Sequence, residues 1–150
     1  AIGAGISDGL GFGDNTKGTL IARGLREMTT IGVRMGADLE TFFGIAGVGV
    51  LFATANSKLS RNYRMGRRIS EFGETPEQAL VAIDQVAEGV GTADVVRRKA
   101  KEFGIELPVM CAIDAILKGE LPPRKAVEQL MSRDLGREKI SGTSGASETV

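Results

Sequence analysis

An apolar stripe with helical spacing, between residues 16 and 37, is the feature that most limits how this chain can fold. Apolar or small side chains recur there at steps of four and three residues: Ile21, Leu25, Met28, Gly32 and Met35. This spacing places all of them on one side of a single long α-helix. No other stretch alternates polar and apolar residues, with β-branched enrichment, strongly enough to compete with a helix. The sequence therefore predicts an all-α fold.

Capping residues mark the ends of the other expected helices. Asp38 and Ser60 each precede a helical segment and can accept hydrogen bonds from its first backbone N–H groups. Thr75, Pro76 and Gln78 follow the order of a capping box, with proline at the first helical position. Three more helices are expected: one from a Thr92 cap to Gly104, one from Pro108 to Gly119, and one from Pro122.

Glycine is unfavourable in the interior of a helix, so its presence there calls for a structural explanation. Gly24 and Gly32 lie inside the long predicted helix, where glycine costs about 1 kcal/mol relative to alanine. We therefore expect another backbone to pack closely at both positions. The glycine-rich start of the chain is a different case: no apolar strand precedes it, and its glycines lack the spacing of a nucleotide-binding loop.

Composition narrows the class of protein. The chain has 150 residues, 42% of them hydrophobic, with 19 basic and 19 acidic side chains. This balance argues against disorder and against a globally basic nucleic-acid binder. No apolar run approaches the roughly 18 residues needed to cross a bilayer. The single cysteine, Cys111, cannot form an internal disulfide, so a reducing compartment, the cytoplasm, is expected.

The organisation expected from these patterns is one domain with a tail. Residues 1–132 hold all the predicted helices, whereas residues 133–150 are small and polar and are expected to form a flexible tail. The chain contains no histidine, which excludes His-dependent catalytic triads and the usual His-containing zinc sites. No metal site is expected. Cys111 lies among apolar neighbours and is expected in the core rather than as a nucleophile.

Positive charge concentrates in one short segment. Five cationic side chains occur within eleven positions, and no acidic residue lies between Glu40 and Glu71. The five are Lys58, Arg61, Arg64, Arg67 and Arg68. Helical spacing puts Arg64 and Arg68 on the same side as Arg61, where they would extend a positive surface.

Two interpretations of this segment remain open from the residues alone. The first is an arginine-rich face that is simply solvated. The second is an anion site at a helix start: if Ser60 is the cap, its hydroxyl, the Arg61 guanidinium, the Asn62 amide and the free backbone N–H groups all face one space. A phosphate would be well bound there.

Several segments in a fixed order carry a family resemblance. They read GISDGLGFGDNTKGTLIARGLREM, GIAGVG, LSRN and VAEGVGTA, within a match that runs from Ala1 to about Arg133. Together they resemble the C-terminal domain of bacterial-type NAD(P)-dependent sn-glycerol-3-phosphate dehydrogenase. The resemblance implies an all-α, multi-helical substrate domain of the 6-phosphogluconate dehydrogenase C-terminal-like type. It also implies a preceding Rossmann domain that binds NAD or NADP, and hydride transfer between glycerol 3-phosphate and dihydroxyacetone phosphate.

The resemblance also assigns site residues. Ser60, Arg61 and Asn62 match the family's contacts to the substrate, and Arg61 lies close to the nucleotide as well. Val86 and Glu88 match positions that touch the cofactor. No catalytic residue of the family is carried over to this chain, because the family's catalytic lysine corresponds to a position a few residues before Ala1.

One substitution departs from the family pattern. Val50 stands where the family has a substrate-contacting aspartate, and an isopropyl group cannot accept hydrogen bonds. Two functions stay open: the substrate domain of a dehydrogenase, inactive as an isolated chain, or a diverged helical domain that serves as a structural or protein-interaction subunit. A homodimer or larger assembly is compatible with both. The plastid stroma is the alternative location if a transit peptide precedes the chain.

Overall fold

A computed structural model describes residues 1–84 and 86–133, and within these ranges it contains helices and no strand. The helices are α1 (Ile2–Gly9), α2 (Asp14–Arg34), α3 (Leu39–Phe43), the π-helix η1 (Ile45–Gly49), α4 (Val50–Ala55), α5 (Arg61–Glu71), α6 (Pro76–Ile83), α7 (Glu88–Phe103), α8 (Pro108–Leu117) and α9 (Pro123–Ser132). The all-α prediction is confirmed. Apart from Arg133, the predicted tail lies outside the described residues. None of the described helices has both the length and the apolar character needed to span a membrane.

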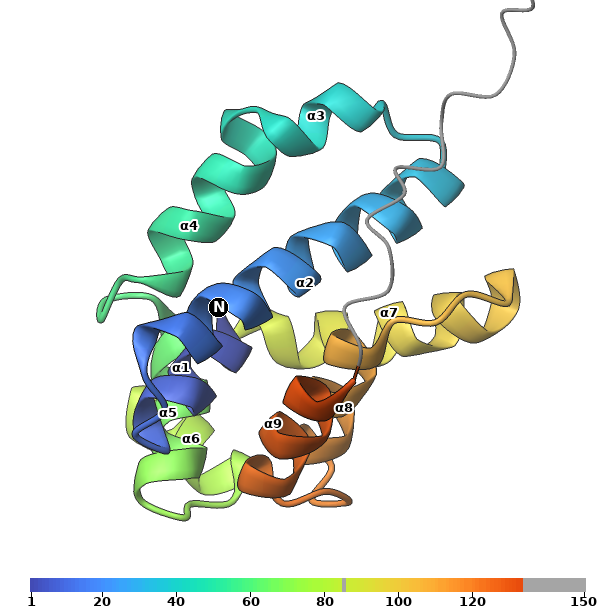
Figure 1. Cartoon of the computed structure of the whole chain (residues 1–150). Coiled ribbons are helices and arrows are strands. Elements are labelled where there is room, and N and C mark those ends of the chain that lie inside the picture. Colours follow the sequence, from blue (N-terminus) through green and yellow to red (C-terminus); the bar gives the residue numbers. More distant parts are fainter. Residues whose placement is uncertain (85, 134–150) are drawn as a thin grey trace, which may run out of the picture.

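The long helix α2 organises the molecule. Figure 1 shows α3 and α4 running alongside α2, whereas α1, α5 and α6 gather near its first turns and α8 and α9 pack together below it. The main core lies among α1, α5, α6, α8 and α9. Its fully or nearly buried side chains include Ile6, Met65, Ile83, Ile116 and Leu130.

Glycines bring α1 and α5 into backbone contact. A Cβ at Gly5 would overlap the carbonyl oxygen of Tyr63, and one at Gly66 would overlap the carbonyl oxygen of Ile2. Only glycine permits such an approach, because any larger residue forces the two helices apart. The start of α5 is therefore held at a fixed place against α1.

Most of the predicted caps are present. The Asp38 carboxylate accepts a hydrogen bond from the Glu40 backbone N–H, at 3.0 Å. Thr75 and Gln78 form the full capping box, with each side chain bonded to the other residue's backbone N–H. Gly104 ends α7 in a left-handed conformation, with φ of 63°. These predictions are confirmed because capping depends on a few neighbouring residues.

Other local predictions were wrong. Thr92 is not a cap: α7 already begins at Glu88, and the Thr92 hydroxyl donates to the Glu88 carbonyl inside the helix, at 2.9 Å. Gly24 has no neighbouring atom near the position of a Cβ, so no backbone packs there. Gly32 does lie in a tight contact, but with the ring of Phe42 rather than with a backbone.

A buried glutamate replaces the missing local cap of α8. Glu27 of α2 is 6% exposed and accepts hydrogen bonds from the backbone N–H groups of Val109 and Met110, at 2.7 and 2.9 Å. Leu107, the residue at the cap position, has no side-chain acceptor. Burial raises the pKa of the Glu27 carboxyl, and these two backbone hydrogen bonds act in the opposite direction.

Candidate functional site

The predicted start of α5 is confirmed at atomic level. Ser60 has extended backbone angles, and its Oγ accepts a hydrogen bond from the Tyr63 backbone N–H at 3.3 Å. Because the hydroxyl acts here as acceptor, its own hydrogen remains available to donate to a ligand. The unsatisfied N–H groups of the first turn also give this end of the helix a partial positive charge.

Arg61 and Glu88 form an ion pair between two helix starts. The Arg61 Nη2 lies 2.6 Å from the Glu88 Oε1, across 27 positions in sequence. Both side chains are accessible, with exposed fractions of 42% and 57%. Such exposed pairs contribute only about 0–1 kcal/mol, so an anionic ligand can compete for the guanidinium.

Asn62 supplies the cap that α7 lacks. Its Oδ1 accepts a hydrogen bond from the Gly89 backbone N–H at 2.9 Å, while Ala87, at the N-cap position, provides no side-chain acceptor. A side chain at 89 would displace its neighbours, because a Cβ there would lie 2.6 Å from the Asn62 Oδ1 and 2.8 Å from the Ile2 Cδ1. The Asn62 amide nitrogen is left as a donor. The starts of α1, α5 and α7 therefore meet at one place.

Val86 belongs to the same region of the surface. It lies two residues before α7 and is 72% exposed. An apolar side chain this accessible can contact a ligand without any rearrangement of the core. The structure thus brings residues 60–62 and residues 86–88, predicted separately as substrate and cofactor contacts, to neighbouring helix starts.

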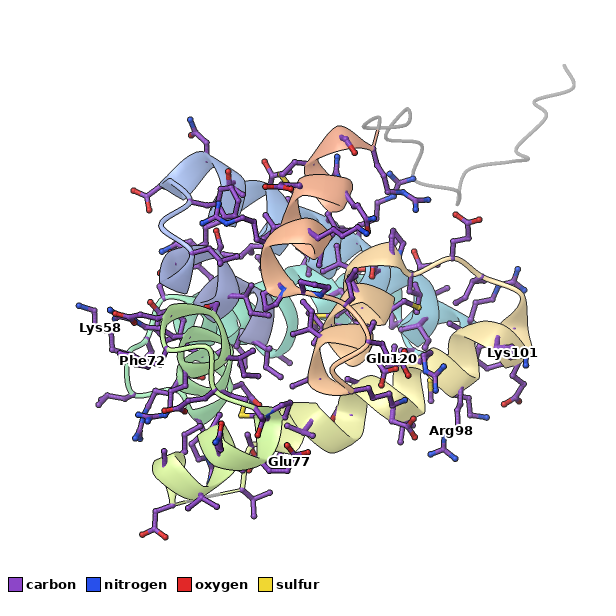
Figure 2. The ribbon with its side chains drawn as sticks, turned by 90° about the horizontal axis from the view of Figure 1, so that it is seen from below. Lys58, Phe72, Glu77, Arg98, Lys101 and Glu120 are labelled. Atoms are coloured by element: carbon purple, nitrogen blue, oxygen red, sulfur yellow. The ribbon has the colours of Figure 1, made fainter. Side chains whose placement is uncertain are left out.

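The extended positive surface predicted for α5 was wrong in part. Arg67 pairs with Glu71 one turn away, and the Nε of Arg68 lies 2.7 Å from the Glu74 Oε2. Lys58 lies at the outer edge of the molecule in Figure 2. For Lys58 and Arg64, the described part of the chain offers no carboxylate within ion-pair distance. Arg61 is paired as well, with Glu88, so the positive field of the described segment is narrower than the sequence suggests.

Val50 lies at the junction of η1 and α4. It is the first residue of α4 and is 51% exposed, so its side chain is not a core residue. The other end of α4 reaches the site region, because the buried Ala55 packs with Ala4 and Tyr63. Val50 itself is five residues, or roughly 7.5 Å along the helix, from that contact.

Two hollows, of about 360 and 630 Å³, lie away from the candidate site, the first against α7 and α8 and the second near the start of α6 and the end of α8. Neither is lined by a predicted site residue. Within residues 1–84 and 86–133, no group of three or more potential metal ligands occurs. Cys111 lines the first hollow, and burial raises the pKa of its thiol, which disfavours the nucleophilic thiolate.

Sequence reasoning missed the polar contacts behind the site. The Asp8 Oδ2 accepts hydrogen bonds from the Tyr63 hydroxyl at 2.7 Å and from the Lys17 Nζ at 3.0 Å. No signal in a single sequence links these residues, because Tyr63 lies 55 positions from Asp8. The hydrogen bond from the Gly89 backbone N–H to Asn62 was missed for the same reason, since the two residues lie 27 positions apart.

Comparisons with known proteins identify relatives of this chain. A family model described as NAD-dependent glycerol-3-phosphate dehydrogenase C-terminus matches residues 1–128. The glycerol-3-phosphate dehydrogenases [NAD(P)+] of Leptothrix cholodnii and Thermoanaerobacter sp. are 46% and 50% identical to this chain. Each match covers 89% of this chain and 40% of the relative. The crystal structure of the Coxiella burnetii enzyme superposes with a TM-score of 0.84 at 39% identity, over 88% of this chain and 40% of that one. The chain thus spans about two fifths of the length of these relatives.

Proposed function

Because the chain belongs to the family of the NAD-dependent glycerol-3-phosphate dehydrogenase C-terminus, we propose that it is the substrate domain of an NAD(P)-dependent enzyme of this kind. The proposed reaction is hydride transfer between glycerol 3-phosphate and dihydroxyacetone phosphate. The observation that carries the proposal is the meeting of residues 60–62 with residues 86–88, through the Arg61–Glu88 ion pair and the Asn62–Gly89 hydrogen bond. The proposed location is the cytoplasm.

The proposed substrate contacts lie in the first turn of α5. The Ser60 hydroxyl and the Asn62 amide nitrogen can donate hydrogen bonds to phosphate oxygens or to substrate hydroxyls. The Arg61 guanidinium can bind a phosphate with two parallel hydrogen bonds, which fixes both its position and its orientation. The partial positive charge at the helix start adds to the same attraction.

The proposed cofactor contacts lie on the other side of Arg61. NAD or NADP, when bound, supplies or accepts the hydride. The exposed Glu88 carboxylate can accept hydrogen bonds from cofactor hydroxyls, and the exposed Val86 offers an apolar surface to a ring. Arg61 is accessible enough to pair with a cofactor phosphate instead of Glu88. The donors and acceptors present therefore fit a dinucleotide, with Arg61 between the two ligands.

The isolated chain is proposed to bind the substrate without converting it. The resemblance places an aspartate where this chain has Val50. Without the aspartate, a contact that strengthens during the reaction would be lost, and with it part of the transition-state stabilisation. Binding, rather than turnover, is therefore the property to measure on this chain.

Titration of the chain with glycerol 3-phosphate, followed by backbone amide chemical shifts, tests the proposal. We expect residues 60–62 and Gly89 to shift at millimolar ligand. Arg61→Ala should weaken binding about tenfold, because a hydrogen-bonded charge contributes roughly 1.5 kcal/mol or more. The matched control is Arg98→Ala, since Arg98 is another accessible arginine, on α7, and its side chain points away from the body of the molecule (Figure 2).

A variant of the competing carboxylate sharpens the test. Glu88→Gln removes the charge that occupies Arg61, so phosphate should bind the variant up to about fivefold more tightly, the equivalent of one exposed ion pair. Unmoved amides at residues 60–62, or equal losses in the Arg61 and Arg98 variants, would contradict an anion site at the start of α5.

A second candidate function rests on a different observation. Five large apolar side chains between α3 and α4 are exposed: Phe43, Ile45, Val48, Val50 and Phe52. An apolar surface of this kind marks a protein interface in many soluble proteins. In this alternative, the chain is a non-catalytic structural or interaction subunit, or forms a homodimer. It differs from the first candidate in predicting association through this face without any phosphate ligand.

A further inference from the structure

One carboxylate joins three helices directly behind the candidate site. Asp8 of α1 accepts two hydrogen bonds at the same oxygen, Oδ2: one from the Lys17 Nζ of α2 and one from the Tyr63 hydroxyl of α5. The Lys17 and Asp8 side chains are only 15% and 25% exposed, and Tyr63 is 4% exposed. The proposed function does not use any of these three groups.

Tyr63 connects this cluster to the first turn of α5. It is the third residue of the helix, it follows Asn62, and its backbone N–H donates to the Ser60 Oγ. Two contacts fix the residue: its carbonyl group lies against Gly5, and its hydroxyl is bonded to Asp8. The position of Tyr63 is therefore linked to that of Ser60 by this hydrogen bond and to that of Asn62 by the helix backbone.

The charges of the cluster favour this arrangement. The Lys17 Nζ lies 3.0 Å from the Asp8 Oδ2 and 3.8 Å from the Asp14 Oδ1, so a positive charge faces the half-buried Asp8 carboxylate. Burial and the bond to Asp8 raise the pKa of the Tyr63 phenol, with Arg67 acting in the opposite direction. The phenol therefore stays protonated and donating at neutral pH. A hydrogen bond to a charged acceptor is stronger and more directional than one between neutral groups.

We propose that Asp8, held by Lys17, is a positioning residue for the phosphate site at residues 60–62 and acts on it through the Tyr63 hydroxyl. This inference rests on the proposed function, because it requires that residues 60–62 bind an anion. Neither Asp8 nor Lys17 touches the ligand in this scheme. Their effect is to hold Ser60 and Asn62 at the spacing that a phosphate needs.

The test uses Tyr63→Phe in the full chain, with glycerol 3-phosphate and inorganic phosphate as probes. This change removes the hydroxyl and keeps the ring. We expect the Kd for both probes to rise about fivefold, the size of one lost hydrogen bond. Asp8→Asn should weaken binding to a similar degree, and the double variant should be no weaker than the singles, because the two groups act as one unit.

A control separates positioning from loss of stability. Val127→Ala removes buried volume from α9, far along the chain from the site, and should lower the unfolding midpoint without changing the Kd. All titrations are made well below the unfolding transition of every variant, so that each protein is fully folded.

The possible results distinguish the two proposals. If the unmodified chain binds and Tyr63→Phe and Asp8→Asn bind equally well, the positioning inference is overturned while the anion site stands. If the losses are strictly additive in the double variant, Asp8 does not act through Tyr63, and the inference again fails. If the unmodified chain binds neither probe, the proposed anion site is wrong and there is nothing for Asp8 to position.

Discussion

Helices α1 and α5 touch at their backbones, whereas the arm formed by α3, η1 and α4 lies alongside α2 with much of its apolar surface exposed (Figure 1). In the first contact, glycines leave no room for a side chain between the helices. In the arm, the buried residues are Gly47 and Ala55, and the ring of Phe42 supplies the contact over Gly32. The two regions therefore use glycine for different purposes.

The difference bears on function. A backbone contact has almost no freedom to adjust, because neither partner can change rotamer. It fixes the start of α5, where Ser60, Arg61 and Asn62 lie. The contact over Gly32 is made by the ring of Phe42, a side chain that can change its rotamer, although α3 and α4 both pack against α2. The closest backbone approach thus lies beside the candidate site, whereas the arm carries the exposed apolar face.

The largest effect is expected for Gly66→Ala. The new Cβ would overlap the carbonyl oxygen of Ile2, so α1 and α5 must separate, and we expect a loss of roughly 4 kcal/mol or more in the free energy of unfolding. Urea denaturation followed by circular dichroism measures it. Gly24→Ala is the control, since its Cβ would meet open space, and it should raise stability by about 0.5–1 kcal/mol. Similar free energies of unfolding for the two variants would show that the backbone contact between α1 and α5 does not depend on Gly66.

A smaller effect is expected for Gly32→Ala. Here the Cβ would meet the end of the Phe42 ring, which can turn aside, so the cost should be about 1–3 kcal/mol. The same denaturation experiment applies, and Phe42→Leu in the Gly32→Ala background should recover part of the loss by relieving the overlap. A cost as large as that of Gly66→Ala would show that the arm is as rigidly fixed as α1.

The smallest effect on stability is expected for Phe52→Ser. Phe52 is 63% exposed, so the free energy of unfolding should change by no more than about 0.5 kcal/mol. Sedimentation velocity over a range of concentrations then reports on the exposed face: weaker self-association in the variant would favour the interaction-subunit alternative. Ile6→Ala, at a position 1% exposed, serves as the buried counterpart and should cost about 2–5 kcal/mol. Comparable losses from both changes would mean that the arm is part of the core.

How well the sequence predicted each feature depended on the range of the interaction behind it. The stripe from Ile21 to Met35 gave the long helix α2, although the helix begins two residues earlier than predicted and ends at Arg34. The caps at Asp38, Ser60 and Thr75 were predicted because each cap bonds within its own first turn. Thr92 was wrong because the true start of α7 is capped from another helix, by Asn62.

The candidate site was predictable only in part. Its residues came from the local chemistry at Ser60 and from a family resemblance, and their roles as ligands remain predictions. The ion pairs of Arg67 and Arg68 were not foreseen, although Glu71 and Glu74 stand nearby in the sequence. A count of like charges in one stretch does not account for carboxylates just beyond its end, and it therefore overestimates the local field.

By itself, the sequence determined that this chain is helical and where several of its helices begin, after Asp38, Ser60 and Thr75 and at Pro108, because periodicity and capping operate over a few residues. Only the tertiary structure decided which helix ends meet. The contacts of Arg61 with Glu88 and of Asn62 with Gly89 span 27 positions, and the contact of Asp8 with Tyr63 spans 55. Such pairings follow from the packing of the whole chain, above all from the glycines that let α1 and α5 touch, and no local pattern encodes them.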